Sequence, residues 1–266
     1  CQQTLKSLWI RPTIMNNILI TGAASGIGKA TAIFFKRKGW QVGLLDIDGS
    51  ALADLSKQLE GAWYAAVDVT DYTQVQQAIS DFTSLHDSRL RVLFNCAGVL
   101  HMGHFEQLTP DQHHKTLAIN INGLVNVIHA SFPFLRHTEN AQVINMSSAA
   151  ALYGAPHMAS FSAAKFAVRG LTEALNLEWR EHEIWVSDLM PAFVNTPLVH
   201  DKDFVAPIVE RLGVDLIAED IALAAWQAVS TYRVHHPVGL SFKALMLVNK
   251  FAPTKITRRM MAFLSR

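Results

Sequence analysis

Several kinds of residue are scarce in this chain, and each scarcity narrows what the protein can be. Only Cys1 and Cys96 are cysteines among the 266 residues, which is too few for a disulfide framework and suits a reducing, cytoplasmic setting. No run of about 18 apolar residues occurs, so we expect no membrane-spanning helix. Residues 1–14 lack the apolar core and cleavage site of a signal peptide. Because Met15 directly precedes the first strand-like run, we expect these residues to be an upstream extension without a role in the fold.

Charge is nearly balanced overall but unevenly distributed along the chain. The formal net charge of +1 argues against nucleic acid as a main partner. No Asp or Glu follows Asp220, whereas basic residues continue to Arg266. We therefore expect a basic, apolar tail at about 240–266, which forms a subunit contact or lines a substrate cleft. The alternative is weak peripheral contact with anionic lipid.

Histidines occur in two adjacent pairs, His113 with His114 and His235 with His236. Adjacent side chains point apart on a helix or a strand, so neither pair forms a convergent set of ligands. We expect no metal site.

Half of the residues are hydrophobic, so the chain can bury a substantial core, and no Gly/Ser/Pro-rich linker divides it. Short aliphatic runs alternate with longer helical patterns. This alternation predicts an α/β fold: a single domain over residues 15–266, with a doubly wound parallel sheet of the Rossmann type and helices on both faces. The expected strands are 17–21, 41–46, 63–67, 90–94, 142–146, 184–189 and 233–238, and the expected helices are 26–38, 71–85, 109–135, 161–181 and 220–230.

One expected helix contains an unfavourable residue. Leu117, Ile121, Leu124 and Ile128 fall at helical spacing and are expected to face the sheet. Asn120 lies among them, in the middle of the helix, where asparagine is disfavoured. Its presence requires a reason other than helix formation.

A glycine-rich turn follows the first strand directly, where residues 21–28 read TGAASGIG. Glycines at Gly22, Gly26 and Gly28 permit a tight turn whose backbone N–H groups approach a pyrophosphate at the positive end of a helix. Asp46 ends the second strand, where a carboxylate can accept hydrogen bonds from an adenosine ribose and repels a 2′-phosphate. The pattern favours NAD over NADP.

These elements resemble the short-chain dehydrogenase/reductase family over residues 15 to about 239. The turn matches the family's TGxxxGxG element, NCAG at 95–98 resembles its NNAG element, and PAFVNT at 191–196 resembles its PGxxxT segment with Ala192 in place of glycine. By this resemblance, Asp68 and Val69 border the adenine, Lys165 bonds the nicotinamide ribose and Thr196 holds the carboxamide. The implied cofactor-binding residues are Gly22, Ser25, Gly26, Ile27, Gly28, Asp46, Asp68, Val69, Asn95, Ala97, Gly98, Lys165, Pro191, Val194 and Thr196.

The family's four catalytic positions correspond to Asn120, Ser148, Phe161 and Lys165, but the family has tyrosine where this chain has Phe161. In such sites a nicotinamide exchanges hydride with a carbonyl carbon while the phenol exchanges a proton with the oxygen. The resemblance implies that Lys165, one helical turn later, supplies the positive charge that lowers the phenol's pKa. It also implies that Ser148 holds the substrate oxygen and that Asn120 anchors a water in the proton relay.

Phe161 fills the volume of the ring but cannot exchange a proton. Loss of a positioned general acid/base lowers the rate by about 10²–10⁴-fold, so we expect impaired activity. Three interpretations stay open: a deliberate Tyr-to-Phe substitution in a working enzyme, a natural cofactor-binding protein without chemistry, and a natural enzyme that uses another acid. Tyr153 and His157 are the candidates for that other acid.

The sequence thus predicts an NAD(H)-dependent oxidoreductase that interconverts an alcohol and a ketone or aldehyde, impaired in this form. The alternative is a non-catalytic NAD(H)-binding sensor. The Phe, Met and Leu content of the last third favours a lipophilic substrate. Residues 195–213, expected to form a loop with a short helix, suit a substrate cover. The resemblance further implies a homodimer or homotetramer.

Overall fold

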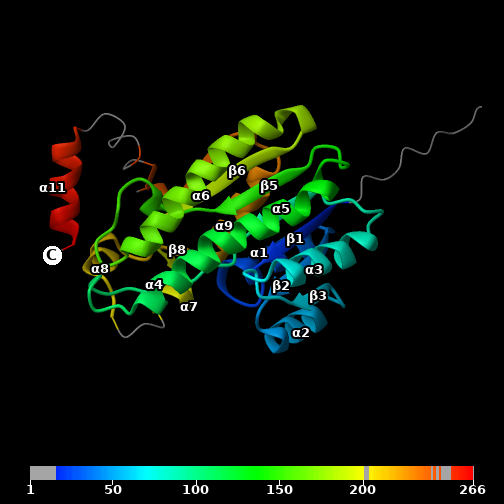
Figure 1. The fold of residues 1–266 in the computed structure, drawn as a ribbon, viewed down its shortest axis with the longest axis horizontal. Helices are drawn as coiled ribbons and strands as arrows, with labels where there is room; N and C mark the ends of the chain where they lie inside the picture. Colours follow the sequence, from blue (N-terminus) through cyan, green and yellow to red (C-terminus); the bar gives the residue numbers. More distant parts are fainter. Residues whose placement is uncertain (1–15, 201–203, 241, 244–245, 247–252, 266) are drawn as a thin grey trace, which may run out of the picture.

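A parallel sheet of seven strands forms the centre of the molecule. In the computed structural model, which describes residues 16–200, 204–240, 242–243, 246 and 253–265, the strand order is β3-β2-β1-β4-β5-β6-β9 (Figure 1). Every neighbouring pair in this sheet is parallel, which confirms the predicted doubly wound α/β fold. The strands are β1 (Asn17–Thr21), β2 (Gln41–Asp46), β3 (Trp63–Ala66), β4 (Val92–Asn95), β5 (Gln142–Met146), β6 (Trp185–Pro191) and β9 (His235–Val238).

The sheet is buried on both faces because successive side chains of a strand enter different cores. On β1, Ile18 and Ile20 belong to one hydrophobic cluster and Leu19 belongs to the other. Strands β1, β4 and β5 are buried along their whole length, whereas β3 at the edge alternates between half-buried and exposed residues. Near-continuous apolar runs are what a sheet covered on both faces requires.

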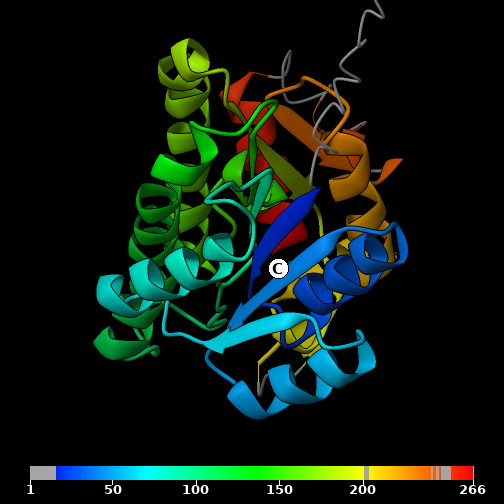
Figure 2. The same cartoon turned by 90° about the vertical axis from the view of Figure 1, so that its right-hand side faces the viewer.

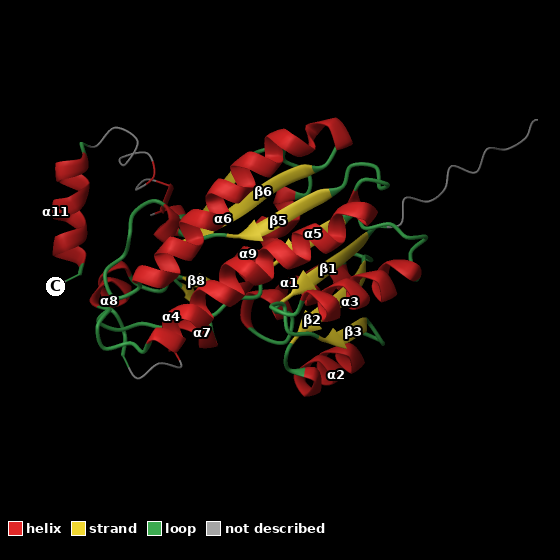
Figure 3. Cartoon of the chain, viewed as in Figure 1, coloured by secondary structure: helices red, strands yellow, loops and turns green. Residues whose placement is uncertain are grey.

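Helices cover both faces of the sheet (Figures 2 and 3). In Figure 2 a first group of helices covers one face, on the blue and orange side, and a second group covers the other face, on the cyan and green side. Gly43 of β2 is required by this packing, because a Cβ there would lie 2.7 Å from the side chains of Leu19 and Phe82. The first group is α1 (Gly26–Arg37), α2 (Gly49–Gln58) and α9 (Ala218–Ala228), and the second is α3 (Tyr72–Ser84), α5 (Leu124–Leu135) and α6 (Ala159–Glu178).

Most predicted elements lie within two residues of their expected bounds, and the strands at 17–21, 41–46 and 142–146 have them unchanged. The predicted helix at 161–181 ends earlier as α6 and continues as a 3₁₀ turn, Trp179–His182. Helix α2 is absent from the predicted elements. It begins with two weak helix formers, Gly49 and Ser50, and its available signal is the cap, where Asp48 accepts a hydrogen bond from Ala51 N at 3.0 Å.

The helix around Asn120 is irregular. Between α4 (Pro110–Leu117) and α5 lies a π-helical turn, Ala118–Gly123, in which the backbone takes one extra residue per turn. The extra residue shifts the face that meets the sheet. Of the four residues predicted to face it, Leu124 and Ile128 pack against the core, whereas Leu117 and Ile121 are half-buried and do not belong to that cluster, so the prediction is confirmed for the last two only.

The combined helix at Pro110–Leu135 is, among the described residues, the one element long and apolar enough to cross a membrane by length and composition. Here it lies between α3 and α6. Its own residues Val127, Ile128 and Leu135 are buried in the core. The helix thus contributes part of its apolar side chains to the core.

Residues 195–213 contain more structure than the predicted loop with one short helix. Strand β7 (Val194–Asn195) pairs in parallel with β8 (Leu216–Ile217), and helices α7 (Pro197–His200) and α8 (Pro207–Leu212) lie between them. The expected extension at 1–14 lies outside the described residues. Of the tail at 240–266, the structure describes Leu240, residues 242–243 and 246, and a segment that contains α11 (Thr254–Leu264).

Candidate active site

A cavity of about 890 Å³ opens at the carboxyl ends of the strands. The strand order reverses here, between β1 and β4, and doubly wound sheets bind ligands at such a switch point because the two following loops diverge. The cavity brings together every predicted site residue except Asn95. Those that line it are Gly22, Ser25, Gly26, Ile27, Gly28, Asp46, Asp68, Val69, Ala97, Gly98, Asn120, Ser148, Phe161, Lys165, Pro191, Val194 and Thr196.

The turn between β1 and α1 is packed so closely that only glycine fits. Gly22 and Gly26 have φ angles of +69° and +49°, and a Cβ on Gly28 would overlap the carbonyl oxygen of Gly22. The Thr21 hydroxyl braces the loop after β4 by accepting hydrogen bonds from Cys96 N at 3.0 Å and from the next backbone N–H at 3.1 Å. The turn thus brings the first N–H groups of α1 to the cavity, a shape that suits a pyrophosphate.

Asp46 lies beside this turn at the end of β2. Its Oδ2 accepts a hydrogen bond from Ala24 N at 3.0 Å, and its Oδ1 accepts one from Asp48 N at 3.1 Å. The carboxylate is half-buried and lines the cavity. It therefore both supports the turn and carries negative charge into the part of the cavity next to it.

Asn95 lies beneath the cavity rather than in its wall. Its Nδ2 donates to Asn145 Oδ1 at 2.9 Å, and Asn145 Nδ2 donates to Thr172 Oγ1 at 2.9 Å. This buried chain of hydrogen bonds joins β4, β5 and α6. Asn95 therefore braces the floor of the site, and its predicted direct contact with a cofactor has no support in this geometry.

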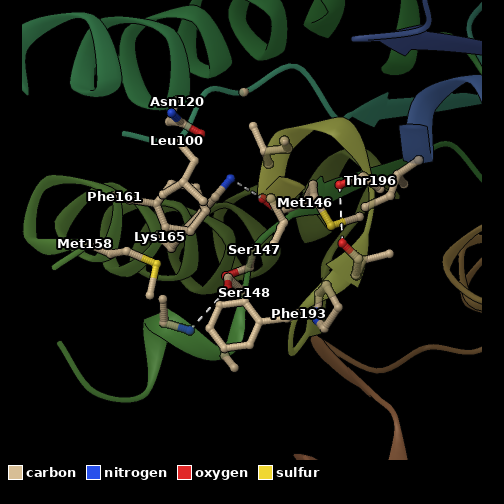
Figure 4. A pocket seen from close by; sticks show the side chains of 18 of the residues that line it. Leu100, Asn120, Met146, Ser147, Ser148, Met158, Phe161, Lys165, Phe193 and Thr196 are labelled. Atoms are coloured by element: carbon tan, nitrogen blue, oxygen red, sulfur yellow. Dashed lines mark hydrogen bonds between the residues drawn. The ribbon is translucent and has the colours of Figure 1, made fainter. Parts of the chain in front are cut away.

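The segment after β6 closes the cavity over the glycine turn. A Cβ at Gly26 would lie 3.3 Å from Thr196 Cγ2, so the two walls are in contact. The Thr196 hydroxyl donates to Val194 O at 3.3 Å (Figure 4). Pro191 and Val194 line the same side.

Lys165 and Phe161, one turn apart on α6, meet at the middle of the cavity (Figure 4). Lys165 Nζ lies 5.3 Å from the centroid of the Phe161 ring and donates to Met146 O at 2.8 Å. Burial lowers the pKa of Lys165 to about 8, against a small opposing effect of Cys96. Burial also raises the pKa of Cys96 to about 12, so that thiol is neutral. Lys165 is therefore a buried amine that can lose or gain a proton not far above neutral pH.

The π turn explains the asparagine in mid-helix. Asn120 Nδ2 donates to Val99 O at 2.8 Å and to Thr116 O at 2.9 Å, while its Oδ1 is buried without a partner. A Cβ at Gly98 would lie 2.7 Å from that oxygen and 3.9 Å from Lys165 Nζ. Asn120 Oδ1 and Lys165 Nζ therefore face the same point above Gly98.

Ser148 begins a short 3₁₀ turn, Ala149–Ala151, after β5. Its Oγ accepts a hydrogen bond from Ala150 N at 3.2 Å, which leaves the hydroxyl proton available to another acceptor. The neighbouring Ser147 Oγ is buried without a partner and also lines the cavity. Ser147 is a site residue that the sequence reasoning missed, although it directly precedes Ser148.

The two candidates for an alternative acid differ in position. Tyr153 lines the cavity and packs against the same hydrophobic cluster as Phe161. The ring of His157 instead packs against His104 and Phe204, with centroid distances of 4.8 and 5.4 Å. Burial, and then His104, lowers the pKa of His157. The geometry favours Tyr153 over His157.

Beyond Phe161 the cavity is apolar, and segments far apart in the sequence make its wall. The predicted cover at 195–213 contributes to it, and so does α11, which belongs to the tail for which a cleft lining was one of the two expected roles. The available signal in α11 is its stripe of apolar residues at helical spacing. The apolar lining includes Leu100, Leu152, Met158, Phe193, Leu198, Ile208, Phe242, Met260, Met261 and Leu264.

One histidine of each adjacent pair makes hydrogen bonds within the protein. His113 Nδ1 is 2.7 Å from Ser160 Oγ, and His235 lies between Asp188 and Glu173 at 3.0 Å from each. The hydrogen bond to Asp188 raises the pKa of His235. In the part of the chain that the structure describes, no group of three His, Cys, Asp or Glu residues is arranged to hold a metal ion. The expectation that the protein has no metal site stays a prediction.

Comparison with known proteins gives the family. Residues 16–204 match the family model described as short chain dehydrogenase. The chain belongs to the short-chain dehydrogenase family. The 3-oxoacyl-[acyl-carrier-protein] reductase FabG of Thermotoga maritima is 31% identical to this short-chain dehydrogenase over 184 residues, which are 68% of this chain and 74% of the relative. The predicted family resemblance is confirmed, and with it the oxidoreductase class.

Two solved structures show how far the fold likeness extends. A short-chain dehydrogenase/reductase from Burkholderia phymatum, in complex with NAD, superposes with a TM-score of 0.78 at 26% identity and covers 92% of this chain and 95% of its own. ElxO with NADP bound superposes with a TM-score of 0.77 at 20% identity and covers 86% of this chain and 99% of its own. At 20% identity, the likeness to ElxO shows a shared fold and nothing further.

Proposed function

We propose that this short-chain dehydrogenase is an NAD(H)-dependent oxidoreductase that interconverts a lipophilic alcohol and a ketone or aldehyde, with activity impaired by Phe161. The main observation that supports this proposal is that the cavity is continuous. It runs from the glycine-rich turn, past Lys165 and Ser148, to an apolar end. A cofactor and an apolar substrate could therefore meet beside these polar groups.

The residues present fit a nicotinamide dinucleotide, because the glycine turn leaves no room for side chains at Gly22 and Gly28 and exposes backbone N–H groups. Asp46 would accept hydrogen bonds from the adenosine ribose and disfavour a 2′-phosphate, which supports NAD over NADP. Lys165 would hold the nicotinamide ribose and Thr196 the carboxamide. The bound nicotinamide would supply or accept the hydride.

The chain's own side chains would position the substrate oxygen. The Ser148 hydroxyl proton is available to donate to a carbonyl oxygen. Asn120 Oδ1 and Lys165 Nζ face one point and would hold a water there. The ring at position 161 carries no hydroxyl that could pass a proton between this water and the substrate. Proton transfer should therefore be the slow step.

The second candidate function is an NAD(H)-binding sensor without chemistry, and Phe161 in an otherwise complete site favours it. A natural enzyme with another acid would use Tyr153, which reaches the cavity. For either reading we place the protein in the cytoplasm as a homodimer or homotetramer, as a single domain in which residues 195–213 cover the substrate. Leu198 and Ile208 support that cover, since both line the apolar end.

The test compares this chain with Phe161→Tyr over a panel of secondary alcohols and ketones, and measures NADH formation and consumption. We expect kcat/KM to rise by about 10²–10⁴-fold in the variant, because the phenol restores general acid/base catalysis. Calorimetric titration with NADH gives a readout independent of turnover. Silence in both proteins with retained NADH binding would favour the sensor.

A matched Tyr153→Phe variant tests the remaining alternative. If the unaltered chain turns over measurably and this variant does not, Tyr153 is the proton donor. Equal activity in both would exclude Tyr153 from the reaction.

A further inference from the structure

Helix α11 presents two different faces. Thr257 and Met261 are buried, Met260 and Leu264 are half-buried, and all four line the apolar end of the cavity. Six other side chains that the structure describes on this helix are exposed. These exposed side chains are Lys255, Ile256, Arg258, Arg259, Ala262 and Phe263, with Ile256 55% and Phe263 70% exposed. Of these, Phe263 lies at the edge of the two faces, because it also lines the cavity.

The helix forms the outer wall of the cavity, at one end of the molecule (red in Figure 1). It packs against α8, where Arg211 donates a hydrogen bond to the carbonyl oxygen of Phe263. The Arg211 guanidinium also lies 5.0 Å from the centroid of the Phe263 ring. Among the described residues, α11 therefore lies between the apolar end of the cavity and the surroundings.

The outer face is both cationic and apolar. Three of its exposed side chains, Lys255, Arg258 and Arg259, are basic, and the sequence contains no Asp or Glu after Asp220. Since the whole chain carries only +1, the rest of it has an excess of acidic groups, and positive charge is concentrated in this last part. A helix with exposed apolar side chains among Lys and Arg has the character of helices that lie at an anionic membrane surface.

A second copy of the chain is a poorer partner for this face. A two-fold contact places the same patch on both sides of the interface, so the cations of one α11 would meet those of the other. Like charges brought together across an interface are unfavourable. The charge of the face therefore favours an anionic surface over self-association.

We propose that the outer face of α11 docks on an anionic lipid surface and that the cavity behind it takes its lipophilic substrate from that surface. The second part rests on the proposed function, whereas the first part does not. One short helix with three cations provides weak, reversible attachment. The attachment should weaken as salt screens the charges.

The experiment is sedimentation with vesicles of phosphatidylcholine alone and of phosphatidylcholine with about a third phosphatidylglycerol, chosen as an anionic surface. We expect binding to the anionic vesicles only, decreasing with added salt. The double variant R258Q/R259Q, whose side chains do not line the cavity, should bind on the order of thirtyfold more weakly.

The matched control R37Q/K57Q removes the same charge from exposed positions on α1 and α2, away from α11 in Figure 1, and should bind as the unaltered chain does. Equal loss in both double variants, equal binding to neutral and anionic vesicles, or no binding to either would overturn the proposal. So would a change in oligomeric state in R258Q/R259Q without a change in vesicle binding, which would assign the face to a second copy. None of these readouts requires turnover, so a failure of the proposed reaction would be seen separately, in the Phe161→Tyr assay.

Discussion

Two walls of the same cavity are built in different ways. The wall next to β1 is a turn of eight residues held by backbone contacts, in which Gly28 lies against the Gly22 carbonyl oxygen. The opposite wall is assembled from α8 and α11, where Ile208 and Met261 pack in one side-chain cluster. The backbone of a tight turn cannot shift to accommodate an added atom, whereas the side chains of a cluster can partly repack. The first wall should therefore be intolerant of substitution and the second comparatively tolerant.

The largest effect is expected from Gly28→Ala, because the new Cβ would overlap backbone rather than a movable side chain. We expect the free energy of unfolding to fall by about 3 kcal/mol and NADH affinity to be lost with the shape of the turn. Urea unfolding and calorimetric titration measure the two effects. The control is Gly170→Ala in α6, which meets nothing within 4 Å and should gain about 0.5–1 kcal/mol. Unchanged NADH affinity in Gly28→Ala would contradict the contrast between the walls.

A smaller effect is expected in the second wall from Met261→Ala. Met261 is buried in the cluster that closes the apolar end, and its truncation should lower the free energy of unfolding by about 2 kcal/mol. NADH affinity should stay the same, because the side chain lies beyond Phe161. A loss of NADH binding comparable to that in Gly28→Ala would show that the two walls are not independent.

The smallest effect is expected from the ionisation of Lys165, which lies where the two walls meet, on the free energy of unfolding. Burial places its folded pKa at about 8, below its ordinary value of 10.5, so between these values the unfolded chain holds a proton that the folded chain has lost. Stability then rises with pH, by about 1 kcal/mol from pH 8 to pH 9. Above pH 9 the raised pKa of Cys96 acts in the opposite direction, so the window ends there.

The measurement for Lys165 is urea unfolding at several pH values in this window, for the chain and for Lys165→Met. The variant should lack the rise, and subtracting its profile removes the contribution of other groups. A rise of equal size in the variant would show that Lys165 is not the titrating group.

The features that could be predicted from the sequence are local ones. The glycine turn follows directly on β1 and Asp46 ends β2, and the strand bounds are readable because buried parallel strands are short apolar runs. The same locality explains the misses. The π turn at Ala118–Gly123 has no repeating pattern, so the regular spacing through Leu117 and Ile121 did not reveal it. The inward hydrogen bonds of Asn95 depend on β5 and α6, which lie far along the chain.

The sequence by itself determined the doubly wound sheet, the family and the wall beside β1, because these depend on residues close to one another in the chain. Only the tertiary structure decided which distant side chains share the cavity with Phe161. It brought Tyr153 to the cavity, left His157 outside its wall and, between the alternatives open for the tail, made α11 part of the cavity wall. Side-chain packing between distant segments leaves no fixed spacing in the sequence, so the apolar end could be identified only once the chain was folded.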